Sequence, residues 1–120
     1  MRDFPTSLRF ENQEMQRELC TRVRALGIEA TEQPDGTLSF AQDQWGNVNR
    51  EAHKIRDHRF GLWNFLSFSP EEYLRRQIGL MRTHKIPHEL EYHGTRLVLL
   101  LPRNLSKEHK DLLTLPDIPD

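Results

Sequence analysis

The feature that most constrains the fold is a repeat, because the chain resembles itself when it is shifted by 58 residues. Over the 31 gapless positions from 10 to 40, seven residues are identical in the two copies: Phe10 and Phe68, Glu14 and Glu72, Arg17 and Arg75, Arg24 and Arg82, Ile28 and Ile86, Gly36 and Gly94, and Thr37 and Thr95. Average composition gives about two identities by chance over such a stretch. The repeat predicts one duplicated unit, with copies at approximately 6–41 and 64–101.

The first copy has the pattern of a strand, a helix and a hairpin. Leu8 and Phe10 alternate with polar residues as on a strand. An apolar stripe at helical spacing follows, made of Met15, Leu19, Val23 and Leu26, with Gly27 as the stop. Extended segments 28–33 and 37–41 flank a Pro34-Asp35-Gly36 sequence, in which proline and glycine favour a turn.

The second copy repeats this order. Ser69-Pro70-Glu71-Glu72 has the residues of a helix start, and an apolar stripe follows: Leu74, Ile78 and Met81. Segment 86–92 alternates and predicts a strand with one apolar face and one acidic face, carrying Glu89 and Glu91, that meets water. Segment 96–101 is apolar at consecutive positions, which predicts a central strand covered on both faces.

A linking helix at approximately 44–59 is predicted between the copies. Its apolar stripe is Val48, Ala52 and Ile55. This stripe leaves most of the charged residues on the solvent side: Arg50, Glu51, Lys54, Arg56 and Asp57. A short helix capped by Ser106 and a tail are predicted over 105–120.

These elements predict an α+β fold, a two-layer sandwich with a mainly antiparallel sheet built from a duplicated β-α-β-β unit. The first β-α-β-β-α-β stretch also has the element order of a ferredoxin-like fold. A chain of 120 residues fits a single domain over 1–120.

Composition narrows the functional classes. The formal net charge is −1, but residues 50–85 carry eight basic and four acidic side chains, so only this middle region is basic. No apolar run approaches the roughly 18 residues that span a bilayer, and the N-terminus lacks a secretory pattern. Cys20 is the single cysteine. We therefore expect a cytoplasmic protein with no membrane contact, and Cys20 as a core residue.

Catalytic chemistry has weak sequence support. The six histidines form no strong metal motif, and no glycine-rich phosphate loop is present. We therefore expect no catalytic, cofactor or metal residues. A small enzyme remains an alternative, with His53 and Asp57, or His88 and Glu89, as an acid–base pair.

The aromatic segment 60–68 suggests a contact surface. If Leu66 and Phe68 face the core like Leu8 and Phe10, then Trp63 and Phe65 point to the opposite face. Either the linking helix or the C-terminal segment covers them, or a partner does.

Our leading hypothesis is a non-enzymatic binding or regulatory module that acts through protein–protein contact, as a homodimer or with another protein. Its expected contact residues are Trp45, Trp63 and Phe65. The alternative is an RNA-binding module using basic residues near aromatics: Lys54, Arg56, Arg59, Arg75, Arg76, Arg82 and Lys85.

Overall fold

The computed structural model describes residues 4–66 and 71–103. The first half contains β1 (Ser7–Phe10), α1 (Gln13–Ala25), β2 (Ala30–Glu32) and β3 (Leu38–Phe40). A single 3-10 turn at Gln42–Gln44 leads into α2 (Trp45–Phe60). The second half contains β4 (Trp63–Leu66), α3 (Glu71–Thr83), β5 (Glu89–His93) and β6 (Arg96–Pro102). The predicted C-terminal helix, Phe68 and the Ser69-Pro70 helix start lie outside the described residues.

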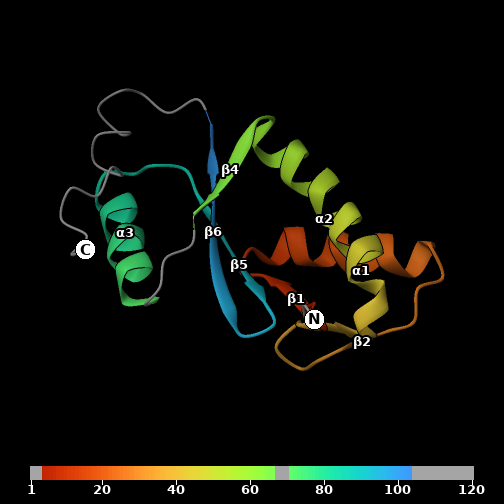
Figure 1. Ribbon diagram of the computed structural model, residues 1–120. Coiled ribbons are helices and arrows are strands. Elements are labelled where there is room, and N and C mark those ends of the chain that lie inside the picture. The colour runs from red at the N-terminus through yellow and green to blue at the C-terminus, as the bar shows by residue number, and fades with distance from the viewer. Residues whose placement is uncertain (1–3, 67–70, 104–120) are drawn as a thin grey trace.

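The six strands within the described residues form one antiparallel sheet in the order β2-β3-β1-β5-β6-β4. Figure 1 shows this sheet nearly edge-on, with α1 and α2 on one side and α3 on the other. The predicted α+β class and antiparallel sheet are confirmed.

Each sheet face has its own apolar core. Leu8 and Phe10 pack with α1 and α2, whereas Leu90 packs with α3. Strand β6 serves both cores, because Leu100 belongs to the first and Leu99 to the second. It lies between β5 and β4, so the prediction of a central strand covered on both faces is confirmed.

The chain follows the same path in both halves. In the first, the hairpin β2-β3 folds back so that β3 pairs with β1. In the second, the hairpin β5-β6 folds back so that β6 pairs with β4. Strands β1 and β5 join the halves. Duplication of one unit and the ferredoxin-like arrangement stay predictions.

Local sequence signals mark the two ends of α1. The Asn12 side chain accepts hydrogen bonds from the backbone N–H groups of Glu14 and Met15, as an N-cap does. Gly27, at φ 73°, lies in the left-handed region that glycine adopts freely at a helix end. Leu26 is 57% exposed, so its predicted place in the buried stripe is wrong. It is the C-cap residue, where the chain already leaves the helix.

Three residues predicted to face solvent are buried instead. Glu51 and Arg56 lie on the inner side of α2, and Glu91 points from β5 to the same sheet face. Glu51 binds Lys54 at 3.0 Å and lies 3.7 Å from Arg22 of α1. The solvent-side prediction fails at these positions because each charge meets an opposite charge where the elements pack.

Candidate protein contact site

A buried ion pair lies between α2 and β5. The side chain of Arg56 is 1% exposed and that of Glu91 is 0% exposed. Arg56 donates from Nε to Oε2 of Glu91 at 2.9 Å and from Nη2 to Oε1 at 2.7 Å. Its Nη1 donates to Oδ1 of Asn49 at 3.0 Å. This two-point geometry suits a planar guanidinium and a carboxylate, so each charge is compensated inside the protein.

His93 extends the pair toward the surface. Its Nε2 lies 2.9 Å from Oε1 of Glu91. Burial raises the pKa of the Glu91 carboxyl, but hydrogen bonds with His93 and Arg56 and the charge of Arg56 outweigh burial and leave that pKa below its ordinary value. Glu91 is therefore an anion at neutral pH, and it orients the side chains of Arg56 and His93.

Aromatic rings surround this polar group. The guanidinium carbon of Arg56 lies 4.8 Å from the ring centroid of Phe65 and 5.4 Å from that of Trp63. The His93 ring lies 5.2 Å from Trp45 and 5.6 Å from Phe65, centroid to centroid. The ring centroids of Trp63 and Phe65 are 4.9 Å apart. The three residues predicted as contact residues, Trp45, Trp63 and Phe65, therefore gather around one polar centre; we call them the aromatic cluster.

The His53–Asp57 pair, proposed from the sequence as acid–base machinery, positions Trp63. Its Nε2 and Oδ2 atoms are 3.4 Å apart, and both side chains are more than half exposed. Asp57 accepts a hydrogen bond from Nε1 of Trp63 at 2.7 Å, and the His53 ring lies 5.0 Å from the Trp63 ring. The linking helix thus holds the indole from two sides.

The second acid–base pair from the sequence turns to separate partners. Nδ1 of His88 lies 2.8 Å from the backbone oxygen of Ile86. Glu89 accepts a hydrogen bond from Nε of Arg59 at 2.8 Å and from the Asn12 amide at 3.3 Å. These contacts tie β5 to α2 and to the start of α1.

The aromatic cluster reaches the surface at two places. Phe65 is 38% exposed, whereas Leu62, which is 55% exposed, lies outside the cluster and points to the other sheet face. An open hollow of about 520 Å³ also adjoins Trp45 and His93. The other residues that line it are Phe4, Pro5, Gly94, Thr95 and Arg96.

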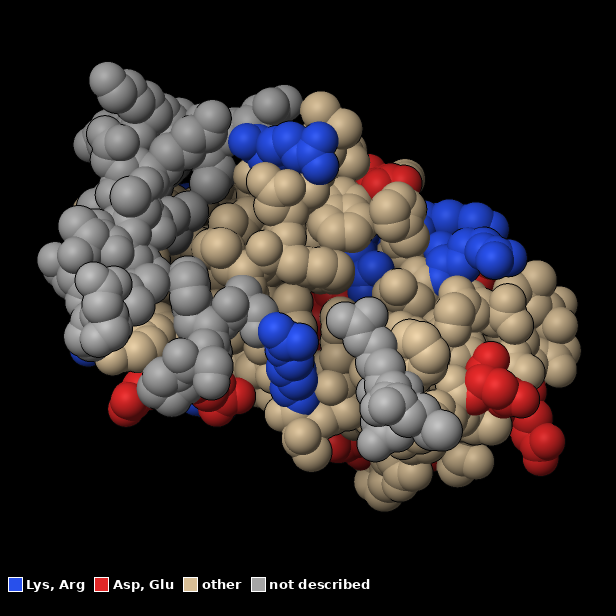
Figure 2. Space-filling model, in the orientation of Figure 1, with Lys and Arg blue, Asp and Glu red and all other residues tan. Residues whose placement is uncertain are grey.

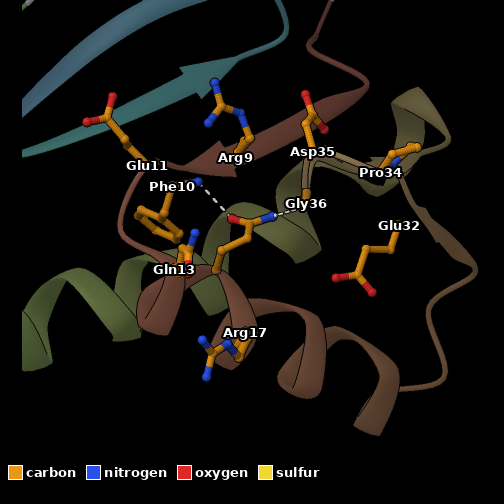
Figure 3. Close-up of a pocket in the computed structure, with 10 residues that line it drawn as sticks. Arg9, Phe10, Glu11, Gln13, Arg17, Glu32, Pro34, Asp35 and Gly36 are labelled. Carbon is orange, nitrogen blue, oxygen red and sulfur yellow. Dashed lines mark hydrogen bonds between the residues drawn. The ribbon is translucent and has the colours of Figure 1, made fainter.

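A second hollow, of about 280 Å³, lies between the start of α1 and the β2–β3 turn (Figure 3). The charged residues that line it carry both signs: Arg9, Arg17, Glu11, Glu32 and Asp35. Gln16 accepts from the Phe10 N–H at 2.7 Å and donates to the Gly36 carbonyl at 2.6 Å. Gln16 therefore ties the strand to the turn, and its amide is occupied.

The basic residues proposed for RNA do not gather on one surface. Lys54, Arg56 and Arg59 belong to α2, whereas the rest lie on or just after α3, across the sheet (Figure 1): Arg75, Arg76, Arg82 and Lys85. Arg56 is buried, and several others face carboxylates, as Arg75 faces Glu71 at 3.2 Å. In Figure 2 the Lys and Arg residues form separate groups.

Sequence reasoning missed the polar centre of the site: Arg56, Glu91 and His93. A signal for Arg56 existed, because it lies four residues after Ala52 and so extends the buried stripe of the linking helix. Glu91 and His93 alternate on β5 and therefore share a face. No local pattern in the sequence relates that face to Arg56.

No protein-family model, curated protein or solved structure matches this chain. Within residues 4–66 and 71–103, no group of three or more His, Cys, Asp or Glu side chains is placed to hold a metal ion. None of the described helices is both long and apolar enough to cross a bilayer.

Proposed function

We propose that this chain is a non-enzymatic binding or regulatory module that acts through contact with a protein, using the aromatic cluster of Trp45, Trp63 and Phe65. The observation that carries the proposal is their convergence on one centre, with Phe65 still 38% exposed. Large aromatic side chains supply most of the affinity in protein interfaces, especially near their centre.

The cluster is also held in place before any partner arrives. Asp57 fixes the Trp63 indole, and Arg56 lies against both Trp63 and Phe65. Glu91 fixes Arg56 in turn through two hydrogen bonds. A surface whose side chains are already ordered loses less conformational entropy on binding, which favours affinity.

A cytoplasmic location goes with this proposal and stays a prediction from the sequence. The RNA-binding and enzymatic alternatives also stay predictions. The division of the basic residues between two sheet faces gives the RNA alternative less support than the aromatic cluster gives protein contact.

Site-specific photo-crosslinking tests the proposal. A benzophenone analogue of phenylalanine replaces Phe65, and in a separate variant it replaces Leu26, which is more exposed than Phe65 and lies at the C-terminal end of α1. After irradiation in the native cell, mass spectrometry identifies protein adducts. We expect a discrete adduct from position 65 that position 26 does not give.

The adduct is then confirmed with purified partner. Phe65→Ala should weaken binding about 30-fold, since truncating an aromatic hot spot costs about 2 kcal/mol or more. Leu26→Ala is the control and should bind like wild type. The same adducts from both positions, or equal affinities for both variants, would refute the proposal.

A further inference from the structure

We propose that the protein partner is a second copy of this chain, joined through antiparallel pairing of the two β4 strands about a two-fold axis at Asn64. The inference rests on the proposed function, because the pairing brings Trp63 and Phe65 of the aromatic cluster into the interface. It adds the identity of the partner and the register of the contact.

Strand β4 is the last strand of the sheet, and within the described residues no strand pairs with its outer edge. The N–H of Arg103 donates to the Leu62 carbonyl at 2.9 Å, so the Leu62 backbone points toward β6. Backbone groups alternate along a strand, which leaves those of Trp63 and Phe65 pointing outward. Pro102 lies opposite Trp63 and has no N–H to donate. This fits a Trp63 backbone that points away from β6.

The edge is chemically symmetric about its middle residue. Read in either direction, Leu62-Trp63-Asn64-Phe65-Leu66 is aliphatic, aromatic, amide, aromatic, aliphatic. Antiparallel pairing about a two-fold axis at Asn64 sets Trp63 opposite Phe65 of the second copy, and Leu62 opposite Leu66 of the second copy. Residues directly opposite in an antiparallel pair share a face. Aromatic side chains therefore meet on one face of the joined sheet and leucines on the other.

The hydrogen-bonding pattern of β4 is compatible with the same register. Trp63 and Phe65 both point outward, so in this register they form two hydrogen-bonded pairs across the axis, with four N–H···O bonds. A shift by one residue sets backbone groups that point outward against groups that point inward. It also pairs each aromatic residue with a residue that is not aromatic. A shift by two in one direction pairs Phe65 with Gly61, which ends α2 at φ 73° and lies outside the strand.

The β4 edge also lacks the usual protection against pairing. Segment 62–66 itself contains no charged residue and no proline, although the Arg103 side chain lies against Trp63 and Asn64. Figure 2 shows the surface over β4 as tan, with blue atoms only at its upper border. The opposite edge, β2, differs, because it is only three residues long and is flanked or occupied by Glu29 and Glu32. The charges therefore favour β4 as the joining edge.

Arg103 is compatible with this pairing. Its Nη2 donates to the Trp63 carbonyl at 3.2 Å and its Nε donates to Oδ1 of Asn64 at 3.3 Å, both at the exposed surface. A carbonyl oxygen has two lone pairs, so Trp63 retains acceptor capacity for the second copy.

Sedimentation velocity and a cysteine pair test the partner and the register. Wild type should sediment as a dimer at high concentration and dissociate on dilution. In the proposed register the Asn64 Cα atoms of the two copies are about 4.5 Å apart, within disulfide range. The Leu62 Cα atoms of the two copies are about 14 Å apart. Asn64→Cys should therefore form a disulfide-linked dimer under mild oxidation, whereas Leu62→Cys should not.

A charge substitution provides a second measurement on a folded variant. Leu62→Lys should raise the dimer dissociation constant about tenfold or more, since it loses an apolar contact and places charge on the edge. Leu26→Lys makes the same change at a similarly exposed position away from β4 and should leave dissociation unchanged. Thermal unfolding of both variants confirms that they are folded.

The outcomes separate this inference from the proposed function. A wild-type chain that stays monomeric at several hundred micromolar overturns the inference, but a specific Phe65 adduct with another protein still supports the function. A dimer that ignores Leu62→Lys, or that links equally through both cysteine variants, also overturns the inference. A β4-joined dimer that Phe65→Ala leaves intact keeps the pairing and contradicts the role of the aromatic cluster.

Discussion

Arg56 and Glu91 matter for the surface although neither meets solvent. The guanidinium lies against Trp63 and Phe65, and the carboxylate sets its position and that of His93. The polar centre therefore acts as a support under an aromatic surface. Its cost in desolvation is offset only while both charges are present, which makes the pair testable as a unit.

Removal of one charge should cost far more than removal of both. Arg56→Met or Glu91→Leu alone should lower the free energy of unfolding by about 3–5 kcal/mol, because an unpaired buried charge remains. The double variant should recover most of that loss. Urea denaturation of the four proteins measures the coupling. Arg75→Met, which breaks an exposed pair with Glu71, should change stability by less than about 1 kcal/mol. Additive losses at positions 56 and 91 would contradict the coupling.

Acid should also act through Glu91. The pKa of its carboxyl is lower in the folded protein than its ordinary value of 4.5, which applies in the unfolded chain. The carboxylate therefore stabilises the fold at pH values above 4.5. This contribution is lost as the pH falls below the ordinary value and through the lower, folded-state value. The free energy of unfolding of wild type should therefore fall more steeply than that of Glu91→Gln between about pH 5 and pH 3. Urea denaturation at several pH values compares the slopes; equal slopes would contradict the assignment. A hydrogen bond from the Thr37 backbone also lowers the pKa of the Asp35 carboxyl, but Asp35 is present in both proteins, so its contribution cancels in the comparison.

Among the elements, β4 has two functions at once. Its inner backbone edge completes the sheet against β6, while its side chains divide between the two cores. Trp63 packs with the α1 and α2 core and Leu66 with the α3 core, as the alternation predicts. The phase of its backbone determines which residues hold the sheet and which are available to a partner.

Proline substitutions test which backbone N–H groups of β4 point toward β6 and which point outward. Asn64→Pro removes an N–H that points toward β6, whereas Phe65→Pro removes one that points outward. Relative to alanine at the same position, proline at 64 should lower the free energy of unfolding by at least about 1 kcal/mol more than proline at 65, the value of a ladder hydrogen bond. Chemical denaturation of the four variants tests this. The opposite order would reverse the phase of β4 and remove the basis for pairing through it.

Across residues 4–66 and 71–103, the fold is a single sheet with helices on opposite faces in its two halves (Figure 1). Strands β1 and β5 join the halves, and β6 contributes to both cores. Unfolding of one half therefore exposes apolar surface of the other, which favours cooperative unfolding.

Hydrogen exchange should report that cooperativity. Backbone amides in β1, β5 and β6 that bond within the sheet should exchange only through global unfolding, with one shared free energy. Amides of β2, a three-residue edge strand, should exchange through local opening and with lower protection. NMR-detected exchange measures both groups. Clearly different opening free energies for β1 and β6 would show instead that the halves unfold separately.

The sequence by itself predicted the helices and strands of the described residues and several local features. The period of Leu74, Ile78 and Met81 gave a helix whose inner face is buried as expected. Gly27 and Gly36 mark a helix end and a turn, both at positive φ. The consecutive apolar residues of β6 predicted burial on both faces. These features depend on neighbours within a few residues, so local stereochemistry and hydrophobic period decide them.

Only the tertiary structure decided the strand order, the face that each helix covers and the burial of Arg56 with Glu91. The two residues are 35 positions apart, and a charged side chain considered alone is expected at the surface, even where, like Arg56, it extends an apolar stripe. Burial becomes favourable only when packing brings opposite charges together and water is excluded from both. Sequence alternation placed Trp63 and Phe65 on one face, but the contacts of Trp45 and Phe65 with His93 required α2, β4 and β5, which are distant in the chain, to meet.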